Sequence, residues 1–143
     1  MTRLASLMIA LILAIASGIP AAMAADPIAV RIDDPGICGN SRVLGQITHR
    51  FAHQVRNVPN LPLVDIVNFR QTSESRYQPQ GYRQPIERRY CHAKADLSNG
   101  HTRDVWYLIE RPMGFVGFGS NVEFCVSGFD RWHVYGGRCR VVR

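Results

Sequence analysis

An Asn-Gly pair between two segments of alternating apolar residues is the feature that most constrains the fold of this chain of 143 residues. The pair, Asn99-Gly100, is typical of a two-residue type I′ turn, because both central positions of that turn require a positive φ. Such a turn would join residues 86–97 and 102–110 as the arms of an antiparallel hairpin. The chain is therefore expected to contain an antiparallel sheet built on this hairpin.

A two-residue turn also fixes the register of the two arms. The register places opposite charges across from each other at two positions, and each such pair contributes about 0.2 to 1 kcal/mol. A slip by one residue would turn every side chain of one arm to the other face. The predicted pairs are Leu97 with Thr102, Asp96 with Arg103, Ala93 with Trp106, Cys91 with Leu108 and Arg89 with Glu110.

The register assigns the side chains of the hairpin to two faces. Consecutive strand residues point to opposite faces, so Cys91 and His92, which are neighbours in sequence, cannot share a site. We expect Cys91 on the core face and His92 on a half-polar face. The core face is predicted to contain Cys91, Ala93, Ala95, Leu97, Trp106 and Leu108, and the other face Tyr90, His92, Lys94, Val105, Tyr107 and Ile109.

The first residues of the chain have the pattern of a secretory signal peptide. Arg3 precedes an uncharged apolar stretch over residues 4–15, Gly18 and Pro20 interrupt it, and an Ala-Met-Ala pattern ends at Ala24. A transmembrane anchor is the alternative, because a spanning helix needs about 20 apolar residues and the stretch without charge continues to Ala25. The glycine, the proline and the small residues favour cleavage after Ala24, which would leave no membrane anchor.

We therefore expect a signal peptide over residues 1–24 and one small α+β domain over residues 25–143, located in the periplasm or secreted. A domain of this length suits a single core. The full chain has a net charge of +6, and after the leader every basic residue except Lys94 is an arginine. Arginine favours bidentate contacts with carboxylate and phosphate, although genomic base composition produces the same bias.

Four cysteines follow the predicted leader. An even number of cysteines in a short exported chain indicates disulfides, and Cys38, Cys91, Cys125 and Cys139 match neither a C-x-x-C motif nor a usual zinc spacing. Three pairings are possible. The pair closest in sequence, Cys125 with Cys139, is favoured, which leaves Cys38 with Cys91. We expect two bridges and neither a metal site nor a cofactor.

Residues 40–59 have the spacing of an amphipathic helix of about four turns. Ser41 is the predicted N-cap, and Pro59 prevents further extension. The predicted apolar stripe is Leu44, Ile47, Phe51, Val55 and Val58.

The remaining segments predict strands and connections. Strands are expected at residues 62–70, 86–97, 102–110 and 121–128. Residues 71–85 are rich in Gln, Ser, Pro and Arg and are interpreted as a mobile connection, and the tail is expected to add a short strand interrupted at Gly136-Gly137. The predicted fold class is α+β, in which one N-terminal helix packs on an antiparallel meander of about four strands, cystatin-like or similar.

The histidines are candidates for metal ligands and for catalytic groups. His49 and His53 are four residues apart, a spacing that can hold a metal. At 100° per residue they lie away from the apolar stripe, among basic and polar residues without a carboxylate, so a solvated helix face is the better interpretation. His101 and His133 have no partner nearby in the sequence.

The C-terminal segment contains arginines interleaved with aromatic residues and no acid between them. On a cytosolic protein this pattern would favour single-stranded nucleic acid, but export makes nucleic acid a poor ligand. An anionic envelope polymer, a lipid headgroup or an acidic protein partner fits such a surface better, and ordinary arginines on a terminal strand are the alternative. The candidate residues, which we call the tail surface, are Arg131, Trp132, Tyr135, Arg138, Arg140 and Arg143.

A glycine-rich segment precedes the last predicted strand. Residues 114–120 lack the pattern of a P-loop, so a flexible connection is the simple interpretation. Its two aromatic residues, Phe115 and Phe118, are candidates for a partner or lipid contact if they are exposed, and otherwise fold under the sheet edge.

The segments RRYCHAKADLSNG, VWYLIE and VEFCVSGFDRWHVYGGRCRV together resemble small exported proteins of uncharacterised function found among alphaproteobacteria. The resemblance covers residues 86–143, with a weaker match in ICGNSRVL. It implies an exported, cysteine-bridged α+β domain and supplies no catalytic residues.

Two hypotheses about function follow. The first is an exported, non-enzymatic binding module that uses the tail surface and the aromatic loop. The second is a small hydrolase or lyase, which needs a histidine and a carboxylate within about 3.2 Å in a concave pocket. The candidates for the second are His92 or His133 with Asp104, Glu110 or Glu123.

Overall fold

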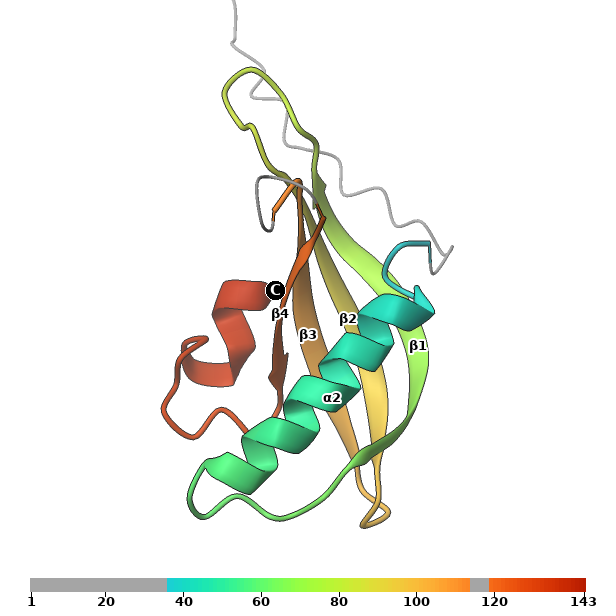
Figure 1. The fold of residues 1–143 in the computed structure, drawn as a ribbon, viewed down its shortest axis with the longest axis vertical. Coiled ribbons are helices and arrows are strands. Elements are labelled where there is room, and N and C mark those ends of the chain that lie inside the picture. The colour runs from blue at the N-terminus through green and yellow to red at the C-terminus, as the bar shows by residue number, and fades with distance from the viewer. Residues whose placement is uncertain (1–35, 114–118) are drawn as a thin grey trace, which may run out of the picture.

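The structure, a computed structural model, describes residues 36–113 and 119–143. One helix, α2, runs diagonally across one face of a four-stranded antiparallel sheet with the order β1-β2-β3-β4 (Figure 1). The predicted α+β fold class, with a helix on a four-stranded meander, is confirmed. The elements are α2 (Ser41–Asn57), β1 (Ile66–Gln78), β2 (Glu87–Leu97), β3 (Thr102–Arg111), β4 (Asn121–Val126) and the 3-10 segment η2 (Gly137–Val142).

Two predictions concern residues that the structure does not describe. The signal peptide and its cleavage site lie before residue 36, and Phe115 and Phe118 lie in the gap at 114–118. Both stay predictions. Among the described residues, none of the helices has the length and apolar content needed to cross a membrane.

Helix α2 begins one residue earlier than predicted. Asn40, not Ser41, is the N-cap, and its side-chain oxygen accepts a hydrogen bond of 3.0 Å from the backbone N–H of Arg42. The buried side chains recur every four residues and face the sheet. Val43 takes the first buried position, and the predicted Leu44 is only partly buried beside it. The buried residues are Val43, Ile47, Phe51 and Val55.

The hairpin forms where predicted, but its loop has three residues rather than two. The N–H of Gly100 donates to the carbonyl of Leu97 at 2.9 Å, and the N–H of Leu97 donates to the carbonyl of His101 at 2.8 Å. Within the loop only Gly100 has a positive φ, +81°. The φ of Asn99 is not positive. This is a type I turn followed by a left-handed glycine, the second common way to close a hairpin. The type I′ prediction was wrong because Asn-Gly fits both loops.

The extra loop residue shifts the register by one and inverts the faces predicted for the second arm. Cys91 pairs with Tyr107 instead of Leu108, and Ala93 pairs with Val105 instead of Trp106. The face toward α2 therefore contains Val105, Tyr107 and Ile109, and the opposite face contains Trp106 and Leu108. The predicted charge pairs are replaced by Lys94 with Asp104 and Arg88 with Glu110.

Strand β1 extends into the segment that was predicted to be a mobile connection. Residues 73–78 pair with β2, and along the whole strand the pairing is interrupted by three register shifts. Their polar side chains find partners on β2: Ser75 donates to the carbonyl of Tyr90 at 3.0 Å, and Glu74 pairs with Arg89 at 2.8 Å. Composition alone missed this strand because its stabilising contacts are polar and lie on the neighbouring strand.

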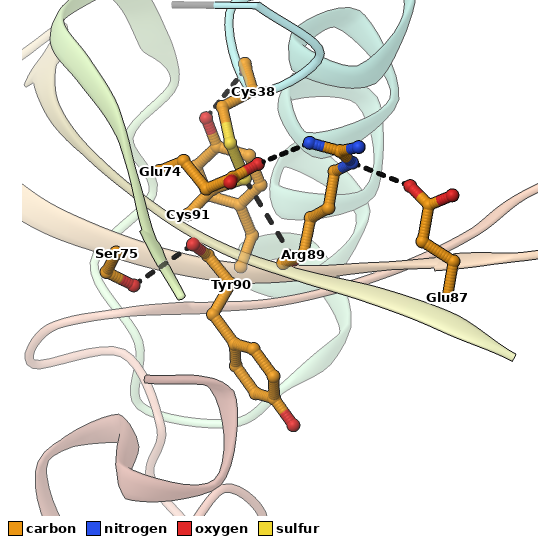
Figure 2. Close-up of a disulfide and its surroundings, with 8 residues drawn as sticks. Cys38, Glu74, Ser75, Glu87, Arg89, Tyr90 and Cys91 are labelled. Atoms are coloured by element: carbon orange, nitrogen blue, oxygen red, sulfur yellow. Dashed lines mark hydrogen bonds and ion pairs between the residues drawn. A yellow bond between two sulfur atoms is a disulfide. The ribbon is translucent and has the colours of Figure 1, made fainter. Parts of the chain in front are cut away.

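Two disulfides connect the chain with the favoured pairing. Cys38–Cys91 lies in the larger core between α2 and the sheet, where Tyr107 donates a hydrogen bond to the carbonyl of Cys38 at 2.7 Å. Figure 2 shows this bridge close to Arg89, which lies between Glu74 and Glu87. As predicted, Cys91 and His92 lie on opposite faces.

The second disulfide, Cys125–Cys139, belongs to a smaller core on the sheet face that α2 does not cover. It attaches η2 beside β4, at the left of Figure 1. Val142 is fully buried there, and Tyr90 and Leu108 complete the core. The predicted terminal strand was wrong, because the tail turns at Gly136 and continues as a 3-10 segment that packs on the sheet instead of extending it.

Acid is expected to weaken the fold between about pH 4 and pH 2 through Asp96. Arg70 donates two hydrogen bonds to this carboxylate, at 2.7 and 2.6 Å, and holds its pKa at about 2, below the ordinary 3.8. As the pH falls, the unfolded chain binds the Asp96 proton first, so the stability from this pair is complete above about pH 5 and lost as the pH falls through the folded-state pKa.

The variant Asp96→Asn tests this. It should be less stable than the native protein at about pH 6, and the difference should vanish near pH 2, as measured by urea unfolding at both values. A difference that does not change with pH would contradict the role given to Arg70.

Candidate functional site

The segment after β4 folds around one aspartate. Both carboxylate oxygens of Asp130 accept backbone hydrogen bonds, from the N–H of Val134 at 2.8 Å and of Tyr135 at 3.0 Å. The carbonyl of Asp130 also accepts the N–H of His133 at 3.2 Å. These bonds show that the carboxylate shapes the loop, and among the described residues it forms no ion pair with an arginine.

A pocket of about 350 Å³ lies between this loop and helix α2. We call it the helix pocket. Its volume lies at the lower end of the range for small-molecule sites. Three of its residues come from the tail surface and four from the helix. They are Arg131, Trp132 and Tyr135 from the tail and His49, Arg50, His53 and Gln54 from α2.

Contacts from α2 to β4 and to Phe129 hold the helix beside the segment that forms the other wall of the helix pocket. Arg50 donates to the carbonyl of Val122 on β4, and its guanidinium lies 5.9 Å from the ring centroid of Phe124. Gln54 donates to the carbonyl of Phe129 at 3.0 Å. Burial raises the pKa of Tyr135 above its ordinary value, and the nearby carboxylate of Glu123 raises it further. The phenol is therefore neutral near pH 7 and can donate a hydrogen bond.

A second pocket, of about 470 Å³, lies on the other side of the loop, beside η2. We call it the arginine pocket. It shares Asp130 and Arg131 with the helix pocket. The other basic residues that line it are His133, Arg138 and Arg143. The guanidinium of Arg143 lies 4.6 Å from the ring centroid of Trp106, on the sheet face opposite α2.

The predicted tail surface is thus divided between two adjoining pockets. Arg131, Trp132 and Tyr135 line the helix pocket, and Arg131, Arg138 and Arg143 line the arginine pocket. Arg140 is exposed and lines neither of these two.

The contribution of α2 was missed by sequence reasoning. His49 and His53 are exposed, as predicted, and they also line the helix pocket. No local pattern indicates this, because it depends on where the tail packs, more than 70 residues later in the chain. The described residues contain no group of three or more His, Cys, Asp or Glu side chains placed to hold a metal ion.

The predicted histidine-carboxylate pair is also present, on the sheet face opposite α2. His92 Nε2 lies 2.7 Å from Asp104 Oδ1, which meets the distance that the enzyme hypothesis requires. The one-residue register shift brings the two side chains together. The same oxygen also accepts Lys94 Nζ at 2.6 Å. The hydrogen bond from Lys94 lowers the pKa of Asp104, burial opposes this, and His92 lowers it further.

The other predicted catalytic groups do not form such a pair. Glu110 is bound by Arg88 at 2.9 Å and by Asn121 at 3.3 Å. His133 lines the arginine pocket with Asp130, whose oxygens are taken by the backbone. Neither the helix pocket nor the arginine pocket includes His92.

Comparison of the chain with protein-family models, with curated proteins and with solved structures gave no match.

Proposed function

We propose that this chain is an exported, non-enzymatic binding module whose tail surface recognises an anionic envelope component or an acidic protein partner. The proposal depends mainly on one observation. Two adjoining pockets are lined by arginines that have no carboxylate partner among residues 36–113 and 119–143. These arginines are Arg50, Arg131, Arg138 and Arg143, of which Arg50 already donates to the carbonyl of Val122.

Three arginines of the sheet provide a contrast, although Arg76, Arg103 and Arg111 of the same sheet also have no carboxylate partner among the described residues. Arg70, Arg88 and Arg89 are each paired with a carboxylate at 2.9 Å or less. An unpaired guanidinium in a cavity keeps its donors available, and its planar fork matches the two oxygens of an anionic group. Trp132, whose side chain is 63% exposed beside these cations, adds the kind of aromatic surface that is enriched at binding sites.

Export is the other part of the proposal. Two disulfides in a small chain are typical of proteins that leave the reducing cytoplasm. The leader pattern over residues 1–24 and the resemblance to exported alphaproteobacterial proteins support the same localisation, in the periplasm or outside the cell.

The test uses two immobilised polyanions, polyglutamate and heparin. The double variant Arg131→Ala/Trp132→Ala should weaken binding about tenfold or more, because hydrogen bonds to charged groups contribute about 1.5 to 3 kcal/mol and each 1.4 kcal/mol corresponds to a factor of ten. Binding is measured as the dissociation constant at fixed salt concentration.

Arg83→Ala is the matched control, since Arg83 is exposed between β1 and β2 and its loss changes the net charge by the same amount as loss of Arg131. Equal weakening by both variants would show that net charge, and not the tail surface, causes binding. Failure of the native protein to bind either polyanion would contradict the proposed function.

The alternative, a small hydrolase or lyase, is supported by the 2.7 Å contact between His92 and Asp104. It is less well supported because Lys94 binds the same Asp104 oxygen as His92. Neither the helix pocket nor the arginine pocket contains the pair. Turnover of an ester or glycoside that is lost in His92→Gln and kept in Arg131→Ala would favour this alternative over the binding module.

A further inference from the structure

We propose that the arginine pocket is a subsite for a phosphoryl group, so that the anionic ligand of the tail surface is a phosphorylated molecule. This inference rests on the proposed function and makes it more specific. It starts from the charges that line the pocket. Arg131, Arg138 and Arg143 line one pocket together with His133, and the one acid of the lining, Asp130, accepts two backbone N–H groups.

The number of cationic groups favours phosphate over carboxylate. A carboxylate offers one charge and two oxygens, which one guanidinium fork satisfies. A phosphomonoester has a charge of about −1.5 to −2 near pH 7 and three terminal oxygens. The pocket is lined by three arginines and one aspartate, so positive charge is in excess there in the absence of an anion. A dianion with three acceptor oxygens balances that charge better than a carboxylate does.

One arginine is held in place before any ligand binds. The guanidinium of Arg143 lies over the Trp106 ring at 4.6 Å, and the main-chain oxygen of Arg143 accepts a hydrogen bond of 3.0 Å from Arg76. Arg76 itself lies 3.6 Å from the ring centroid of Tyr90. Stacking on an aromatic ring leaves the edge of a guanidinium free to donate, so Arg143 is positioned and still able to bind.

The backbone of the pocket is also fixed in an uncommon conformation. His133, Arg138 and Cys139 all line the pocket and all have a positive φ, between +54° and +63°. Residues other than glycine adopt this region infrequently, and such strain persists where the surrounding structure enforces it. The Cys125–Cys139 bridge and the buried Val142 enforce it here. The pocket is thus preorganised, which lowers the entropic cost of binding.

The adjoining helix pocket suggests where the rest of the ligand lies. The two pockets share Arg131, and the helix pocket adds Trp132, Tyr135 and Phe124. A phosphoryl group in the arginine pocket would place an attached apolar or sugar moiety against these aromatic side chains.

The experiment titrates inorganic phosphate into the full disulfide-bonded protein near pH 7 and follows the backbone amides and arginine Nε–H groups by NMR. The expected result is a dissociation constant of about 1 mM or tighter, with the largest shifts at Arg138, Cys139 and Arg143. Arg138→Gln should weaken phosphate binding about tenfold. Arg138→Lys, which keeps the charge and loses the fork, should restore only part of it.

Arg138 is exposed, so its substitution should leave the spectrum of the sheet unchanged, and Arg83→Ala is again the matched control. A second measurement uses vesicles of phosphatidylcholine that contain phosphatidic acid. Binding to these vesicles tighter than to phosphate identifies a lipid headgroup as the source, and equal or weaker binding identifies a soluble phosphorylated ligand.

The two proposals fail in different ways. If phosphate binds elsewhere or not at all while polyglutamate still binds the tail surface, the phosphoryl subsite is wrong and the binding module stands. If neither polyglutamate, heparin nor phosphate binds, both proposals are wrong.

Discussion

The variant Cys38→Ala/Cys91→Ala is expected to have a free energy of unfolding about 4 kcal/mol below that of the native protein. The bridge closes a loop with a sequence separation of 53 residues, and the entropy that a crosslink removes from the unfolded chain grows with loop length. Both cysteines are buried, at 1% and 0% exposure, so their loss also disturbs the packing between α2 and the sheet. Small domains are stable by about 5 to 15 kcal/mol in total, so this is a large effect.

Urea unfolding monitored by circular dichroism measures this difference in the free energy of unfolding, with the native and variant proteins compared at one pH. Leu63→Ala is a suitable control because Leu63 is 76% exposed, and surface changes of this kind shift stability by about 0.5 kcal/mol or less. A variant whose midpoint matches that of the native protein would show that the packing of α2 holds this core without the crosslink.

The parts of the fold that depend on local pattern could be predicted from the sequence. The apolar spacing of α2 and the alternation in β2 are local properties, and both elements form within a few residues of their expected bounds. The pairing of Cys38 with Cys91 followed from the shorter separation of the other pair. Its burial followed from the alternation of faces, which also separated Cys91 from His92.

The hairpin register could not be predicted from the local sequence. Asn99-Gly100 is compatible with a two-residue and a three-residue loop, and the choice depends on which face of β3 packs against α2. Tyr107 and Val105 both have exposures of 0%, and Tyr107 also donates to the carbonyl of Cys38. The fold therefore selects the register that buries these residues, and the same choice places His92 beside Asp104.

The candidate site was predicted in part. The tail arginines and aromatics were visible as a basic segment without acids, and three of them form one wall of the helix pocket. The opposite wall, from His49 to His53, could not be predicted because it requires the position of the tail relative to α2. The division into two pockets depends on the turn at Asp130 and on the left-handed residues of η2.

Removal of the second bridge should have its largest effect on binding. In the variant Cys125→Ala/Cys139→Ala, binding of phosphate and of polyanions is expected to fall at least about tenfold, because the pocket loses the crosslink that holds Arg138 and Arg143. The bridge closes a loop with a separation of only 14 residues, so the loss of global stability is at most about 3 kcal/mol. It should be smaller than the loss caused by removing Cys38–Cys91.

Tryptophan fluorescence can show whether the tail detaches. The chain has two tryptophans, so in a Trp132→Phe background only Trp106 remains, and Arg143 lies over it in the folded tail. Removal of the bridge should move the emission of Trp106 to longer wavelength as water reaches the indole ring. The circular dichroism of the sheet should stay unchanged. Unchanged emission and unchanged phosphate binding would instead mean that the buried Val142 holds the tail by packing alone. The preorganisation of the arginine pocket would then not depend on the disulfide.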